Sequence, residues 1–269
     1  MIHNCDICGS DNAEELKIAE NYIRDGDKIH VCKNCGFVYV RERRSPEEVA
    51  DSWKQIFGDG YTSAWPGTKA RLFYVAEWYF QKYTWLGKRL LDIGCGYRHF
   101  MDFAKEHGAA TFGIEPAGFL GNINPADRQF VETVPIEKNP FEGKKFDVIS
   151  ILWTLENTGD CNAVIEYAKK HLADNGDILI ATGSRIGVPF KKPLSAYFSV
   201  NPADTHCFRF SMRSLVNLMA KHGFKPSSCN DYQQRDELVC VFKKGMFPFC
   251  TESADAIIHF FDEWRKAWP

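Results

Sequence analysis

The chain has 269 residues, of which 45% are hydrophobic and 25% charged, which describes a globular protein with one main domain and room for a small extra module. Its formal net charge of -2 at pH 7 excludes a general electrostatic attraction to nucleic acid or to an anionic membrane. No apolar run approaches the roughly 20 residues that cross a bilayer, and the first residues do not resemble a signal peptide, so we expect a cytoplasmic protein without membrane contact.

Four of the ten cysteines lie in two Cys-x-x-Cys-Gly pairs near the N-terminus. The pairs are Cys5 with Cys8 and Cys32 with Cys35. Two residues between the thiols let both sulfurs bind one ion from a tight turn, and two such pairs complete a tetrahedral zinc site without an open position for water or substrate. We therefore predict a structural zinc ribbon over residues 1–44. A redox-active dithiol is the alternative interpretation of one pair.

Residues 45–84 are predicted to form a helical linker or cap between the ribbon and the main domain. Ser45 is placed to cap the first helix, and Pro46 stands in its first turn, where an amide hydrogen is not needed. A second helix, over residues 68–83, carries apolar side chains at helical spacing. We expect this helix to lie on the sheet that follows it.

Short apolar runs alternate with helical patterns across residues 85–245. This alternation is typical of a parallel sheet with crossover helices, so we predict an α/β fold with a doubly wound, Rossmann-like and mostly parallel seven-stranded sheet. One crossover helix is predicted to stop at Asn175-Gly176, and a later one to run from a Ser211 cap to Gly223. The candidate strands are 89–93, 111–115, 129–132, 146–152, 177–182 and 238–243, with a seventh near 227–232.

Residues 246–269 contain an amphipathic helix with one apolar stripe. The stripe consists of Ile257, Phe260, Phe261, Trp264 and Trp268. We expect it to pack against its own domain. A contact in a homodimer is the alternative.

The segment Asp92-Ile93-Gly94-Cys95-Gly96 ends the first strand of the main domain and precedes a helix. Its glycines let the chain turn sharply and let a ligand approach the backbone. The next strand ends at Glu115, which can accept hydrogen bonds from both hydroxyls of a ribose, so we expect an adenosine-containing ligand. A dinucleotide fingerprint would need a third glycine at position 99, where this chain has His99.

At these motifs the sequence resembles the class I S-adenosylmethionine-dependent methyltransferases. The family has an acidic residue followed by x-Gly-x-Gly, and a second acidic residue at the end of the next strand. Residues 145–150 look like its fourth strand and residues 171–180 like its helix-to-fifth-strand segment, so that the resemblance covers roughly residues 85 to 244. It implies S-adenosylmethionine as the cofactor. The residues that it implies for cofactor binding are Asp92, Gly94, Gly96, Glu115, Pro116, Leu152 and Trp153.

The resemblance also implies roles within this set. The two glycines would border the methionine part of the cofactor, and Leu152 or Trp153 would lie near the sulfonium or the substrate. The chain departs from the family at Arg98, where a third glycine is common, and at Glu156-Asn157, where the family often has Glu-His. Arg98 would meet the methionine carboxylate or be solvated.

A sulfonium methyl is already activated, so the protein mainly has to place the acceptor in line with the sulfur and exclude water. If the acceptor is a hydroxyl, the candidate bases are His206, Glu156 and Asp204. His206 is the first choice, and holding a backbone carbonyl is its alternative role. The long connection from 184 to 210 mixes cationic and aromatic residues, which suits a lid over a phosphorylated or nucleotide-linked substrate.

We therefore expect O- or C-methylation of a small-molecule acceptor, in particular a saccharide, a sugar nucleotide or a related metabolite. Nucleic acid is disfavoured because residues 152–155 lack the Asn/Asp-Pro-Pro-Tyr/Phe motif of amino methylation. Two alternatives stay open. One is an RNA methyltransferase that docks through the ribbon, and the other is a cofactor-binding protein without catalysis.

Overall fold

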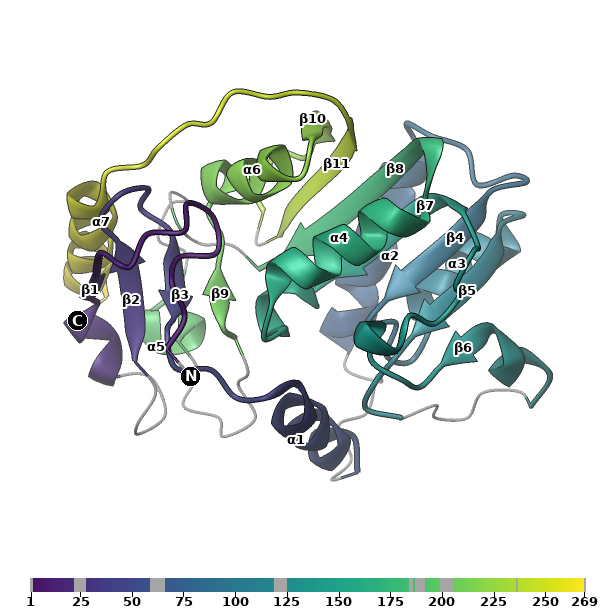
Figure 1. Ribbon diagram of the computed structural model, residues 1–269, viewed down its shortest axis with the longest axis horizontal. Helices are drawn as coiled ribbons and strands as arrows, with labels where there is room; N and C mark the ends of the chain where they lie inside the picture. The colour runs from purple at the N-terminus through teal and green to yellow at the C-terminus, as the bar shows by residue number, and fades with distance from the viewer. Residues whose placement is uncertain are drawn as a thin grey trace.

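The computed structural model describes residues 2–21, 28–58, 66–118, 125–183, 186, 192–198, 206–235 and 237–268. Its main sheet has the strand order β10-β11-β8-β7-β4-β5-β6 (Figure 1). The strands from β4 to β8 run parallel, while β11 and β10 return antiparallel at one edge. This confirms the predicted seven-stranded doubly wound sheet. Its strands are β4 Arg89–Ile93, β5 Ala110–Ile114, β6 Val131–Glu132, β7 Phe146–Leu152, β8 Leu172–Thr182, β10 Phe224–Cys229 and β11 Leu238–Lys244.

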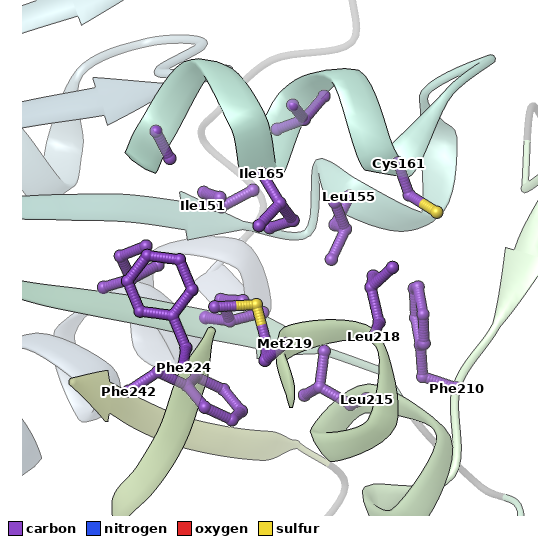
Figure 2. Close-up of a cluster of buried hydrophobic side chains, with 14 of the residues drawn as sticks. Ile151, Leu155, Cys161, Ile165, Phe210, Leu215, Leu218, Met219, Phe224 and Phe242 are labelled. Carbon is purple, nitrogen blue, oxygen red and sulfur yellow. The ribbon is translucent and has the colours of Figure 1, made fainter. Parts of the chain in front are cut away.

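Helices cover both faces of this sheet because successive strand residues point to opposite sides. On β4, for example, Leu90 packs against α2 (Pro66–Phe80) and α3 (His99–Glu106), whereas Leu91 belongs to the core under α4 (Cys161–His171) and α6 (Met212–Lys221). Figure 2 shows the second of these cores, to which Ile165 of α4 and Met219 of α6 both contribute side chains.

The structure confirms the predicted start of one crossover helix and corrects the predicted end of another. Ser211 caps α6 as predicted, because its side chain accepts a hydrogen bond from the Ser214 amide. The other helix, α4, ends at His171 and does not reach Asn175-Gly176. Strand pairing overrides the helical pattern there: Leu172 is fully buried opposite Phe146, and a register shift accommodates the extra residues of β8.

A second, antiparallel sheet lies beside the main one, with the order β1-β2-β3-β9. Its first three strands are β1 Ala13–Glu15, β2 Ile29–Cys32 and β3 Val38–Val40, all from the predicted ribbon. The fourth, β9 (Phe208–Arg209), comes from the connection that leads to α6, and it pairs with β3. The ribbon sheet is therefore completed by a distant part of the chain.

The C-terminal helix α7 (Ala254–Ala267) covers the outer face of the ribbon sheet (Figure 1). Ile257, Phe261 and Trp264 are buried in one cluster with strand residues of β2 and β3. Trp268, which the sequence places in the same stripe, caps the helix and is 41% exposed. The apolar stripe is thus covered within the chain itself.

The remaining elements are short or peripheral. Among them, α5 (Leu194–Tyr197) adds Leu194 to the cluster under α7, and η4 (Leu155–Asn157) follows β7. In the part of the chain that the structure describes, no helix has the length and apolar character needed to cross a membrane. The others are α1 Pro46–Gly58, η1 Lys17–Asn21, η2 Pro125–Phe130 and η3 Ile136–Lys138.

Candidate active site and metal centre

The four N-terminal cysteines converge as the sequence predicts. Their sulfur atoms all lie within 4.8 Å of one another, with 3.6 Å between Cys5 and Cys35 and 3.5 Å between Cys8 and Cys32. A zinc ion held by four thiolates at about 2.3 Å each needs sulfurs at roughly this spacing, so the donor set fits structural zinc. Because thiolates occupy all four positions, such an ion would stabilise the turns without binding a substrate.

The first cysteine turn is docked on the main domain by hydrogen bonds to Asp6, one of the two residues between Cys5 and Cys8. Asp6 forms a buried ion pair with Arg43, and the Asp6 carbonyl oxygen accepts hydrogen bonds from Asn162 of α4 at 3.1 Å and from Lys221 of α6 at 2.7 Å. The ribbon therefore lies against the ends of two helices that flank the main sheet.

The glycine motif forms the turn between β4 and α3. Gly94 has φ +76°, and a Cβ there would stand 2.2 Å from the Oγ1 atom of Thr154, so both conformation and space require glycine. Gly96 has φ +48° and faces open space within 4 Å. The turn consequently packs tightly against the end of β7 on one side and leaves its backbone approachable on the other.

Asp92 lies in β4 directly before this turn and is buried. It accepts a hydrogen bond of 2.6 Å from the Ser150 hydroxyl of β7. Burial raises the pKa of Asp92 to about 7, and the Ser150 hydrogen bond offsets only part of that effect. The carboxyl group thus ties β4 to β7 at the base of the turn.

Glu115 follows β5, and its carboxylate meets the glycine turn from the neighbouring strand. One oxygen accepts from the Gly96 amide at 2.9 Å and the other from the Ala117 amide at 3.1 Å. Burial raises the pKa of Glu115, although both amide hydrogen bonds favour the charged form. Parallel strands end at one edge of a sheet, which brings Asp92, the glycines and Glu115 together there.

The remaining residues of the predicted cofactor set lie at the same edge. Pro116 is exposed in the turn after β5, and Leu152 is the last residue of β7. Trp153 follows with a positive φ of 50°, and the guanidinium carbon of Arg71 lies 4.4 Å from the centre of its ring. The Nε atom of Arg71 is buried and has no hydrogen-bond partner among the described residues.

Arg98 is neither solvated nor free. It adopts φ +68°, the conformation in which the family commonly has glycine, and its side chain is 5% exposed. Its guanidinium pairs with Asp102 at 3.1 Å and with Asp127 at 3.6 Å. The solvated alternative is therefore wrong, because burial and two carboxylates account for this charge.

The candidate bases occupy different positions. Glu156 lies in η4 and is 4% exposed, and its Oε2 atom has no hydrogen-bond partner among the described residues. His206 is half-buried just before β9, which packs beside η4, and its carbonyl oxygen accepts a hydrogen bond from Arg209. Asp204, like much of the predicted lid, lies outside the described residues. Asn157, at the position of the family's frequent histidine, donates to the Trp153 carbonyl at 2.9 Å.

Two residues of this site, Arg71 and Thr154, were not predicted from the sequence. The Thr154 side chain leaves no room for a side chain at Gly94, and the guanidinium of Arg71, in α2, lies over the ring of Trp153. Neither belongs to a motif, and their positions depend on how α2 and the end of β7 pack. The only available signal was the helical pattern that places α2 on the sheet.

A family model described as a methyltransferase domain matches residues 70–228. The ubiquinone biosynthesis O-methyltransferase of Pasteurella multocida is 27% identical over 157 residues, which cover 52% of this chain and 62% of that protein. The corresponding enzyme of Coxiella burnetii is 26% identical over 111 residues, or 39% of this chain and 47% of that one. The chain therefore spans less than two thirds of the length of these relatives.

Two solved structures show the same fold. The 1,6-didemethyltoxoflavin-N1-methyltransferase of Burkholderia thailandensis, with bound S-adenosylhomocysteine, has a TM-score of 0.57 at 15% identity and covers 87% of this chain and 99% of its own. The magnesium protoporphyrin IX methyltransferase of Synechocystis PCC 6803, also with S-adenosylhomocysteine, has a TM-score of 0.53 at 15% identity, with 74% and 96% covered.

Substitution of Gly94 by alanine is expected to lower the free energy of unfolding by about 3 kcal/mol, because strain in the left-handed region adds to the clash with Thr154. Gly87→Ala is the matched control. Gly87 has φ +71° but nothing within 4 Å of the added Cβ, so only about 1 kcal/mol of strain is expected. Urea denaturation measures both values, and equal losses would show that the Thr154 contact is unimportant.

Asp92→Asn should change how stability depends on pH. The buried carboxyl has a pKa of about 7, against 3.8 for an ordinary aspartate, so the folded protein binds the proton more tightly than the unfolded chain. The resulting stability is complete below pH 4 and is lost as the pH rises through 7. Asparagine mimics the protonated acid at every pH. From pH 5 to 8, wild type should therefore lose about 3 kcal/mol relative to the variant. A constant difference in urea denaturation would contradict this.

Proposed function

The chain belongs to the methyltransferase-domain family, and from that premise we propose that it transfers the methyl group of S-adenosylmethionine to a small-molecule acceptor. The observation that carries the proposal is the contact between the Glu115 carboxylate and the Gly96 amide, which brings an acidic group and an approachable glycine turn to the same edge of the sheet. The bound cofactor supplies an activated methyl group on a sulfonium.

The side chains at this edge are suited to different parts of the cofactor. Each oxygen of Glu115 has a second lone pair, so it can accept a ribose hydroxyl while it keeps its backbone amide. Gly94 and Gly96 would border the methionine part. Arg71 and Arg98 each have a buried Nε atom that lacks a partner among the described residues, but the Arg98 guanidinium is already paired with two carboxylates, so we assign the methionine carboxylate to Arg71.

Glu156 is our preferred base for a hydroxyl acceptor. Its buried Oε2 atom makes no hydrogen bond to a described residue, and η4 follows directly on Leu152, Trp153 and Thr154. A carboxylate held in this way can take the acceptor's proton as the methyl group moves from sulfur to oxygen. His206, which lies just before β9 and therefore near η4, stays the alternative base.

A saccharide, sugar nucleotide or related metabolite is the acceptor class that we propose. The relatives named above act, by their names, on a ubiquinone precursor, a magnesium porphyrin and a toxoflavin precursor, so one fold serves chemically different small molecules. The net charge of -2 argues against the alternative of an RNA substrate. Cytoplasmic localisation and the homodimer alternative stay part of the proposal.

Titration calorimetry should show micromolar binding of S-adenosylmethionine and none of NADH. Glu115→Ala and Arg71→Ala should each weaken the binding about tenfold, since each removes a hydrogen bond to or from a charged group. Arg235→Ala is the matched control because this arginine also stacks on an aromatic ring of α2, that of Tyr74, at 4.4 Å. Binding of NADH, or wild-type affinity in both site variants, would refute the cofactor assignment.

Transfer should be assayed as formation of S-adenosylhomocysteine with free, phosphorylated and nucleotide-linked saccharides and with RNA. With an active hydroxyl acceptor, Glu156→Gln should lower kcat about 100-fold and leave cofactor affinity unchanged. The exposed Glu106→Gln should change neither kcat nor cofactor affinity. Transfer to RNA with steeply salt-dependent binding would favour the RNA alternative, and no turnover with any acceptor would favour a non-catalytic protein.

A further inference from the structure

Arg43 connects the four-cysteine cluster with the chain that follows β7. Its side chain is 1% exposed and pairs with Asp6, which lies between two of the clustered cysteines. Its Nη1 atom also donates to the carbonyl oxygen of Gly159 at 3.0 Å. One planar guanidinium therefore holds both the metal-site turn and the segment just after η4.

The position of Arg43 is itself fixed by two further contacts. Its Nε atom donates to the carbonyl oxygen of Val40 at the end of β3, at 2.8 Å. Its guanidinium carbon lies 4.5 Å from the centre of the Phe208 ring in β9. Because all these partners contact one rigid, planar guanidinium, a shift of Asp6 has to move Gly159 or break a buried hydrogen bond.

The metal would control the position of Asp6. The cysteines on both sides of this residue belong to the same cluster, so one bound ion fixes the turn between them. Gly159 lies three residues beyond Glu156, the proposed base. The path from the cluster to the proposed acceptor side thus consists of one turn, one arginine and one short loop.

We propose that Arg43 is a positioning residue through which zinc binding holds the segment from η4 to Gly159 in the geometry that acceptor binding needs. The ribbon is then part of the acceptor side of the enzyme. The consequence for Glu156 rests on the proposed methyltransferase function, whereas the coupling between metal and segment does not.

Hydrogen exchange of the full chain, followed by mass spectrometry of peptides within 153–160, tests this coupling. In wild type, removal of zinc with a chelator should speed exchange of these amides about tenfold, because their anchor is released. Arg43→Ala should produce the same increase while the metal is still bound, which a zinc determination on the variant checks. In Arg43→Ala, chelation should then add little, since the connection is already broken.

Two controls separate positioning from general damage. Arg43→Lys keeps the charge but not the bidentate fork, and it should restore part of the protection. Lys33→Ala removes a cation from the second cysteine turn, where its ion pairs with Glu14 and Asp255 are exposed, and it should leave exchange at 153–160 unchanged.

Unchanged exchange in zinc-loaded Arg43→Ala, or additive effects of the substitution and the chelator, would overturn the inference. So would an Arg43→Lys protein as unprotected as the alanine variant. Titration with S-adenosylmethionine runs beside these measurements. Absence of binding in wild type would count against the proposed function alone, whereas normal binding with unchanged exchange would count against the role of Arg43 alone.

Discussion

The ribbon sheet has two apolar faces, and the architecture of the chain depends on covering both. Val38, Tyr39 and Val40 are consecutive in β3 and all are buried, so neither side of the strand can face water. Tyr39 belongs to the large core that also contains α4 and α6, whereas its two neighbours pack under α7. A small metal module usually relies on its ion because it cannot bury enough surface alone. Here the methyltransferase domain supplies the missing cover.

The same arrangement places the metal-site turn beside the carboxyl edge of the main sheet. Parallel strands end there with Asp92, Glu115 and Trp153, and the ribbon approaches that edge through Arg43 and β9. The proposed cofactor side is formed by strands within the family domain. The side that we propose for the acceptor also receives the ribbon, which precedes the family domain, and acceptor specificity commonly resides in such additions to a shared fold.

Local chemistry explains which features could be predicted from the sequence. Strands such as 89–93 and 146–152, the Ser211 cap and the cysteine pairs each have a signal within a few residues. The early end of α4 has no such signal, because Leu172 is drawn into pairing with Phe146. The roles of Arg43 and Arg71 could not be predicted either. The sequence does not distinguish a buried arginine from an exposed one, because the residues that bury it are distant in the chain.

The pairing of β3 with β9 also determines when the ribbon can be completed during synthesis. Val38 leaves the ribosome long before Arg209, its partner in the sheet, and α7 is translated later still. Until then β3 has an open edge and an uncovered face, the kind of exposed strand that attracts other chains. An early zinc ion would shape the two cysteine turns without closing that edge, so nascent chains of this protein should depend on chaperones until most of the chain has been translated.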